Sequence, residues 1–130
     1  EKIVAAGVKN MRPMWLDLAT DPLPVKRYHV SYSLMTLHHI PDTSSILNKF
    51  HALLEPNGYL LVADLDKEDG SFHTDGTTDV HQGFARNELQ KQVESAGFGN
   101  ITFSTVYEIK KIINGEEKTF PVFLMSARKI

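Results

Sequence analysis

A continuous apolar run near the middle of the chain, YLLVADL at residues 59–65, places the strongest constraint on the fold. A strand with one exposed face alternates apolar and polar side chains, whereas a strand covered on both faces does not. Residues 59–65 lack this alternation, and Pro56 and Gly58 end the helical pattern that precedes them. The run therefore predicts a buried strand, with other structure packed on both of its faces.

Helical and extended segments alternate around this strand. Residues 28–33 alternate as a strand does, and residues 43–55 place their apolar side chains on one helical face. Asp42 or Thr43 can accept from the free N–H groups at the start of that helix. Residues 85–99 predict a second amphipathic helix, and such alternation of strands and helices indicates a parallel sheet.

The last third of the chain predicts an antiparallel hairpin. Residues 100–111 alternate, and Asn114-Gly115 is a strong signal for a two-residue hairpin turn. Residues 120–129 return as a second strand. Because residues 122–125 are continuously apolar, we expect this strand to be central and its alternating partner to be more exposed.

The first part of the chain is less regular. Residues 1–8 indicate the end of a helix, with Gly7 after its last turn. Residues 14–16 predict a strand that either lies at an edge of the sheet or begins after Pro13, because proline cannot donate to a ladder. Since the chain starts at Glu1 within a helical pattern, we expect it to be a segment of a longer protein.

Composition excludes several classes of protein. Hydrophobic residues make up 42% and charged residues 23% of the 130 residues, as in an ordinary globular domain. The net charge is -2 and the basic residues form no stripe, which argues against nucleic acid as a partner. No apolar run approaches the roughly 20 residues of a membrane span, and no signal peptide is visible. The absence of cysteine excludes thiolate chemistry and fits a reducing, cytoplasmic setting.

The order of these segments resembles the C-terminal half of a class I S-adenosylmethionine-dependent methyltransferase of the small-molecule type. The resemblance rests on WLDLATDPLP, YHVSYSLMTLHHIPD, LLEPNGYLLVADLD, HQGFARNELQKQVESAGFGNITF and FPVFLMSARK, in that order. It covers nearly the whole chain, so we expect residues 1–130 to form a single domain that is the C-terminal portion of a methyltransferase domain. The family's N-terminal Gly-rich motif and ribose-binding acid have no counterpart here and are expected upstream of Glu1.

The resemblance implies an α/β fold, namely a partial Rossmann-like sheet of parallel strands with helices on both faces and a C-terminal antiparallel hairpin strand. In this family the last strand inserts between the two strands that correspond here to residues 59–65 and 100–111. Residues 28–33 would lack a neighbour on one side, which leaves an open ladder edge. We expect that edge to be filled by another chain, as in a homo-oligomer, or covered by rearranged local structure.

The resemblance also implies S-adenosylmethionine-dependent methyl transfer to a small-molecule O, N or S acceptor in the full-length parent protein. This chain is expected to be incomplete for cofactor binding, because it lacks the Gly-rich turn. Two alternatives stay open: a catalytically silent α/β interaction fragment, and a metal-dependent hydrolase that uses the loop at residues 66–81. Calorimetric titration with S-adenosylhomocysteine distinguishes the silent fragment from the enzyme. Elemental analysis for bound metal tests the hydrolase.

Four residues are candidates for cofactor binding. The resemblance places Asp17 and Leu18 against adenine, and Ser33 and Leu34 at a strand end where a backbone carbonyl can accept from the cofactor's ammonium group. Ligands in open α/β sheets bind outside the carboxyl ends of the strands. The alternative for Asp17 is a solvated acid that caps a turn. The alternative for Ser33 and Leu34 is an ordinary strand end without a ligand.

Three histidines are candidates for catalysis. His38 and His39 follow the strand at residues 28–33, and histidine suits general-base work near neutral pH. Methyl transfer depends mainly on proximity and orientation, so a packing role for this pair is the chief alternative. His81 is a candidate substrate contact. No metal site is predicted, because adjacent side chains rarely reach one ion and the spacing of His73 and His81 fixes no geometry.

Overall fold

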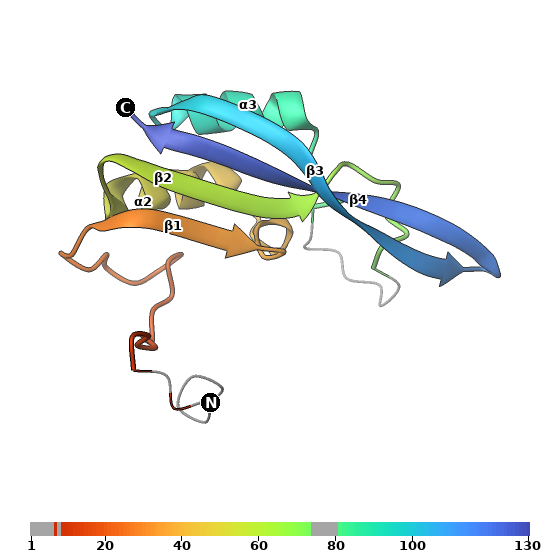
Figure 1. Ribbon diagram of the computed structural model, residues 1–130, viewed down its shortest axis with the longest axis horizontal. Helices are drawn as coiled ribbons and strands as arrows, with labels where there is room; N and C mark the ends of the chain where they lie inside the picture. Colours follow the sequence, from red (N-terminus) through yellow and green to blue (C-terminus); the bar gives the residue numbers. More distant parts are fainter. Residues whose placement is uncertain (1–6, 8, 74–80) are drawn as a thin grey trace.

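The computed structural model describes residue 7, residues 9–73 and residues 81–130. In that part of the chain, four strands form one sheet, accompanied by two α-helices and a short 3-10 helix (Figure 1). The predicted helix end at residues 1–8 lies outside the described residues, apart from Gly7. The elements are β1 (Tyr28–Leu34), η1 (Leu37–His39), α2 (Thr43–Leu53), β2 (Leu54–Leu65), α3 (Arg86–Ser95), β3 (Phe98–Ile113) and β4 (Glu116–Lys129).

The strands follow the order β1-β2-β4-β3 across the sheet. β1 runs parallel to β2, and β4 runs antiparallel to both of its neighbours. The prediction that the last strand inserts between the two preceding ones is therefore confirmed, and so is the α/β fold class. Asn114 and Gly115 have φ angles of 53° and 81°, the left-handed pair that a two-residue hairpin turn requires.

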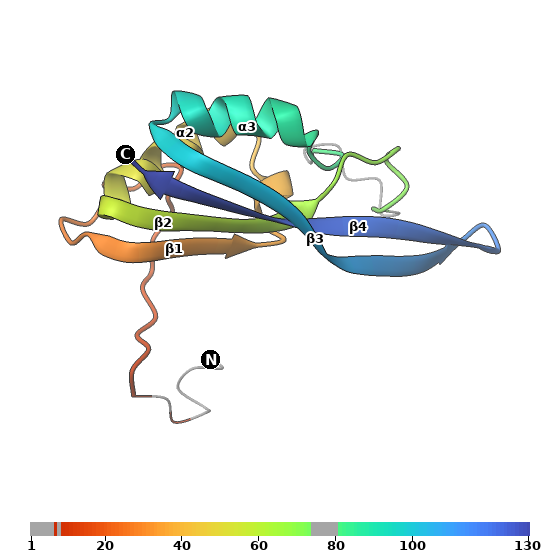
Figure 2. The same cartoon turned by 45° about the horizontal axis from the view of Figure 1, so that its top comes forward.

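Both α-helices pack on the same face of the sheet (Figure 2). Asp42 caps α2, as predicted, because its side chain accepts from the N–H of Ser45 at 3.0 Å. Helical cover of the opposite face, which the resemblance implies, is not seen among the described residues. No helix in the described ranges is long and apolar enough to cross a membrane. The shared core includes Leu47, Phe50, Leu60, Val62, Leu89, Val93, Phe123 and Met125.

The opposite face carries exposed apolar side chains along β1. Val30, Tyr32 and Leu34 alternate with Ser31 and Ser33 and point away from the two helices. We call Val30, Tyr32 and Leu34 the outer β1 face. Within the described residues β1 pairs only with β2, so the local cover that was predicted for its free edge is not seen there. Cover by another chain stays a prediction.

The strand predicted at residues 14–16 does not form, and that prediction is wrong. The segment runs away from the sheet instead of along the free edge of β1 (Figure 2). The Trp15 side chain is 99% exposed. A strand is stabilised by its ladder partner, and among the described residues this segment has none. It ends in a turn in which the N–H groups of Thr20 and Asp21 donate to the carbonyl of Asp17.

Stability should fall below about pH 6.5 through His51, a half-buried residue of α2. Its ring meets Phe98 edge-on at 5.1 Å, and its Nε2 has no hydrogen-bond partner among the described residues. Burial and the Lys129 ammonium group lower the pKa of His51 below its ordinary value of 6.5. In the unfolded chain the His51 ring therefore takes up a proton at a higher pH than it does in the folded chain. As a result, the free energy of unfolding decreases as the pH falls from 6.5 toward the folded-state pKa.

Urea unfolding at several pH values between about 5 and 8 measures this effect. His51→Gln should make the dependence of unfolding free energy on pH below 6.5 less steep, whereas His29→Gln, at an exposed position of β1, should leave it in place. An equal slope in wild type and His51→Gln would contradict the assignment.

Candidate functional site

The stretch SLMTLHHIPD turns sharply across the carboxyl ends of the parallel strands β1 and β2. Met35 has a φ angle of 53°, in the left-handed region, and its N–H donates to the carbonyl of Ala63 at 2.8 Å. The Thr36 hydroxyl donates to the carbonyl of Leu34 at 3.0 Å. A left-handed bulky residue is strained, and such strain concentrates at ligand-binding positions. The turn lies where open α/β sheets bind their ligands.

A cavity of about 590 Å³ lies beside this turn, a volume typical of small-molecule sites. We call it the crevice cavity. Apolar side chains and a few polar groups line it together, so it suits a ligand with a flat apolar part and a polar edge. The lining comes from residues 14–19, from Ser33 and Thr36, and from Ile40, Ile46 and Phe50.

The loop that carries Asp17 is fixed to α2. Lys49 Nζ donates to the carbonyls of Leu18 and Ala19. Asp17 Oδ1 accepts from the N–H of Ala19 at 2.9 Å, and the N–H of Asp17 donates to Asp21 Oδ2 at 2.8 Å. Asp17 therefore caps a turn, which is the alternative to adenine binding that the sequence left open. Within the described chain no group donates to Asp17 Oδ2, which leaves that oxygen available to a ligand.

The structure brings three of the four predicted cofactor-binding residues to one cavity. Asp17, Leu18 and Ser33 line the crevice cavity, although they come from segments well separated in the sequence. Leu34 does not line it, because neighbouring side chains in a strand point to opposite faces. Its side chain belongs to the outer β1 face, and its carbonyl accepts from Thr36.

His38 is buried against Asp64, the last acid of β2 before Leu65. His38 Nδ1 lies 2.6 Å from Asp64 Oδ1, and the N–H of His38 donates to Oδ2 at 3.0 Å. The N–H of Leu65 adds a third bond to Oδ1 at 2.8 Å. Because a carboxylate only accepts, Nδ1 carries the hydrogen in this pair. Burial lowers the pKa of His38 below 6.5, and the Asp64 carboxylate opposes that shift.

The partnership of His38 with Asp64 was not predicted from the sequence. The signal that could have indicated it is the acid at the end of the apolar run at residues 59–65. A carboxylate in such a strand is fully buried only when other groups pair with it and donate hydrogen bonds to it. The structure places Asp64 at 0% exposure, with three N–H donors around it.

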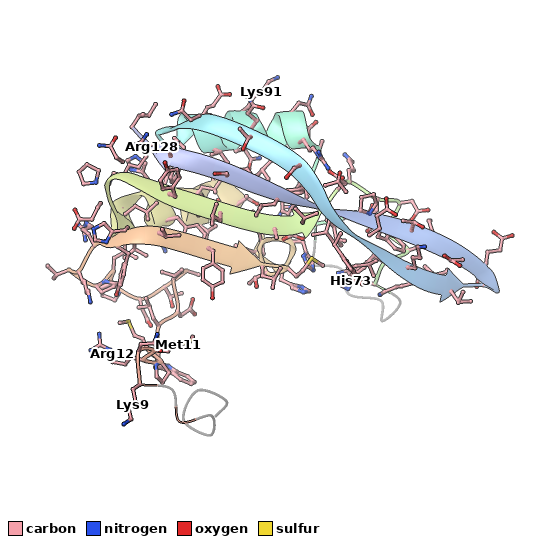
Figure 3. The ribbon with its side chains drawn as sticks, in the orientation of Figure 1. Lys9, Met11, Arg12, His73, Lys91 and Arg128 are labelled. Atoms are coloured by element: carbon pink, nitrogen blue, oxygen red, sulfur yellow. The ribbon has the colours of Figure 1, made fainter. Side chains whose placement is uncertain are left out.

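A third imidazole also lies beside His38 and His39. The ring centroid of His73 is 5.2 Å from that of His38 and 5.4 Å from that of His39. The centroids of His38 and His39 are 4.1 Å apart. Figure 3 shows His73 near the end of β1, where η1 turns. Sequence spacing could not indicate this contact, because it depends on the path of the loop after β2.

His81 packs the long loop onto η1 and α2. Its backbone N–H donates to the carbonyl of His38 at 2.7 Å. Its Nε2 lies 2.8 Å from the carbonyl of Ile40 and 3.2 Å from Thr43 Oγ1. Since the carbonyl only accepts, Nε2 carries the hydrogen. His81 lines a second cavity, of about 380 Å³, rather than the crevice cavity. Asp75 and Asp79 of this loop lie outside the described residues.

A family model described as a methyltransferase domain matches residues 3–103 of the chain. The chain belongs to this methyltransferase domain family. The resemblance inferred from the sequence is thereby confirmed, together with S-adenosylmethionine as the cofactor of the family. The crevice cavity therefore lies at the carboxyl ends of the strands of a methyltransferase-domain sheet.

Curated relatives match shorter stretches of this methyltransferase-domain chain. An uncharacterized methyltransferase of Schizosaccharomyces pombe is 35% identical over 74 residues, which cover 51% of this chain and 26% of the relative. The ubiquinone biosynthesis O-methyltransferase of Marinobacter nauticus is 32% identical over 56 residues, covering 43% of this chain and 24% of the relative. The matches thus span about a quarter of the length of these relatives.

Solved structures extend the likeness to nearly the whole methyltransferase-domain chain. A SAM-dependent methyltransferase from Aquifex aeolicus has a TM-score of 0.65 and 18% identity, covering 99% of this chain and 60% of its own. A Bacillus halodurans protein assigned as a methyltransferase has a TM-score of 0.71 and 15% identity. This match covers 98% of the present chain and 76% of the Bacillus halodurans chain. At these identities the likeness shows the fold.

Proposed function

We propose that the full-length protein containing this chain transfers a methyl group from S-adenosylmethionine to a small-molecule O, N or S acceptor. The observation that carries the proposal is the crevice cavity at the carboxyl end of β1, which gathers Asp17, Leu18 and Ser33. Residues 1–130 supply the C-terminal portion of a single methyltransferase domain in this proposal. Its setting is the cytoplasm, which the absence of cysteine supports.

The lining of the crevice cavity fits the adenosyl part of the cofactor. Ile40, Ile46 and Phe50 offer apolar surface to a flat ring. Asp17 Oδ2 can accept from an exocyclic amino group, and the backbone N–H of Leu18 can donate to a ring nitrogen. When bound, S-adenosylmethionine supplies an electrophilic methyl group. The part of this chain in the reaction is to hold the two reactants close together and exclude water.

The backbone at the end of β1 borders the same cavity. Ser33 lines it, and the Leu34 carbonyl, which already accepts from Thr36, keeps a second lone pair for a cationic group. We assign both residues to cofactor binding through main-chain groups, so the outward direction of the Leu34 side chain does not oppose the assignment.

The histidines take different parts in the proposal. His38 forms a polar wall whose ring is oriented by Asp64. His39 is exposed beside it and can accept a proton where the acceptor must lose one. His81 is assigned as a substrate contact from the loop, although it lines the 380 Å³ cavity rather than the crevice cavity. A homo-oligomer formed through the free edge of β1 remains part of the proposal, because that edge has no partner among the described residues.

Fluorescence of Trp15 tests the proposal, since Trp15 lines the crevice cavity and is the one tryptophan of this chain. Titration of the full-length protein with S-adenosylhomocysteine should give a saturable change in emission, and Trp15→Phe should reduce its amplitude. Asp17→Ala should raise Kd by about tenfold, the equivalent of about 1.4 kcal/mol for one charge-assisted hydrogen bond. Asp69→Ala, on the distant loop after β2, is the matched control and should leave Kd unchanged.

Two outcomes would count against the proposal. An equal Kd for wild type and Asp17→Ala would remove Asp17 from the cofactor site. The complete absence of saturable binding by the full-length protein would favour the alternative of a catalytically silent interaction fragment.

A further inference from the structure

Three histidine rings meet at the turn after β1, and they come from two separate segments. His38 and His39 lie on η1, while His73 approaches from the loop that follows β2. One ring nitrogen from each residue falls within 4.8 Å of the other two. Three imidazoles with converging nitrogens are a typical ligand set for a transition-metal ion.

His38 is prepared to bind through Nε2. Its Nδ1–H donates to Asp64 Oδ1, which fixes the ring and leaves a lone pair on Nε2. Metal-binding histidines generally donate their other ring N–H to a carboxylate or a carbonyl, and this contact orients the ligand and raises its basicity. Asp64 is itself held by the N–H groups of His38 and Leu65. The buried carboxylate thus serves as an outer support for a histidine ligand.

His73 supplies an independent observation. Its Nε2 is buried and has no hydrogen-bond partner among the described residues. A buried polar atom without a partner is destabilising, and such an atom in a native protein calls for an explanation. The neighbouring Phe72 is fixed by Lys111, whose Nζ donates to its carbonyl at 2.7 Å and lies 3.8 Å from its ring centre. The position of His73 is therefore supported, while its Nε2 remains available for an ion.

We propose that His38, His39 and His73 form a Zn²⁺ site with one coordination position open. Nitrogen ligands favour Zn²⁺ over Mg²⁺ and Ca²⁺, which prefer oxygen. Zn²⁺ binds imidazole nitrogen at about 2.0–2.1 Å in a tetrahedral site, which places ligand nitrogens about 3.3 Å apart. Ligand atoms up to 4.8 Å apart must therefore approach one another by up to about 1.5 Å when the ion binds. His39 is exposed, and the solvent on its side can supply the fourth ligand as water.

The Zn²⁺ site stands independently of the proposed methyl transfer, because it requires neither the crevice cavity nor S-adenosylmethionine. It does alter one assignment, since a histidine that binds an ion through its lone pair cannot accept a proton there. With Zn²⁺ bound, His81 is the remaining histidine of the three candidates that can act as a base.

Metal titration of the full-length, chelator-treated protein tests the site directly. We expect one equivalent of Zn²⁺ to bind in calorimetry and to remain after gel filtration, as measured by elemental analysis. His73→Ala and His39→Ala should each raise Kd at least about tenfold, the lower end of the loss seen when support for a ligand is removed. Co²⁺ in place of Zn²⁺ should give the visible absorption of a tetrahedral site, and His39→Ala should abolish it.

Two further variants make the test specific. His73→Cys replaces one Zn²⁺ ligand by another and should restore most of the affinity that His73→Ala loses. His29→Ala removes an exposed histidine of β1 outside the cluster and should leave Kd unchanged. Circular dichroism of each variant separates loss of ligand from loss of fold. Binding below one equivalent, or equal Kd values for wild type, His39→Ala and His73→Ala, would overturn the proposal.

Discussion

Replacing Asp64 by alanine should lower the free energy of unfolding by about 3–5 kcal/mol, because three buried N–H donors would lose their acceptor at a cost of roughly 1–3 kcal/mol each. Asp64 is fully buried and accepts three hydrogen bonds, two from His38 and one from Leu65. Alanine leaves all three donors without an acceptor in the protein interior. The turn after β1 should loosen as well, because the N–H of His38 is held only through Asp64.

Urea unfolding followed by circular dichroism measures this loss, with the midpoint shifting and the m-value unchanged. Asp64→Asn keeps the shape and one acceptor oxygen, so its loss should be smaller than that of Asp64→Ala. Asp69→Ala removes an exposed carboxylate from the following loop and serves as the control. If Asp64→Ala and Asp69→Ala unfold at the same urea concentration, Asp64 does not stabilise the turn.

Replacing Phe123 by alanine should also lower the free energy of unfolding by about 3–5 kcal/mol, the usual cost of truncating a buried phenylalanine. Phe123 lies on β4, the central strand, opposite Asp64 of β2 and Thr105 of β3. It is fully buried, and its ring meets that of Phe103 at 5.3 Å. Truncation would open a cavity between the sheet and α3, where little can move to fill it.

The matched control for Phe123 is Tyr107→Ala, an aromatic truncation at a 66% exposed position of β3. Its free energy of unfolding should change much less than that of Phe123→Ala. Phe123→Leu keeps most of the apolar volume and should fall between the two. A small effect of Phe123→Ala, no larger than that of Tyr107→Ala, would mean that this core is loosely packed.

The hairpin could be predicted because its turn is determined by two neighbouring residues. The central place of the last strand could be predicted because a strand buried on both faces has a continuous run of apolar residues. Asn114-Gly115 indicates a turn, since these residue types tolerate the positive φ angles that the turn demands. The apolar run at residues 122–125 indicates a central strand, and β4 is indeed paired on both sides. The family resemblance then supplied the direction and neighbours of that strand.

The segment at residues 14–16 shows where such prediction fails. Its apolar pattern is compatible with a strand, but a strand also requires a ladder partner, which the pattern does not encode. Among the described residues no chain segment lies along the free edge of β1, and Trp15 is exposed to solvent. Residue preference was therefore overruled by the lack of tertiary contacts.

The histidine cluster and its carboxylate were beyond sequence reasoning for a different reason. His38 and His39 were recognised, but the contact of His73 with them depends on how a long loop folds back after β2. The adjacent pair was expected not to share one ion. The tight turn of η1 brings both rings to 4.1 Å from each other, and the loop adds the third.

The unpaired edge of β1 should make the purified protein prone to aggregation. In the part of the chain that the structure describes, one whole row of main-chain donors and acceptors faces water, beside the apolar side chains of Val30 and Tyr32. Each molecule can thus act as a template for the next, so losses to aggregation should grow as the protein is concentrated. A lysine in place of Tyr32 would act as a gatekeeper and prolong shelf life without touching the crevice.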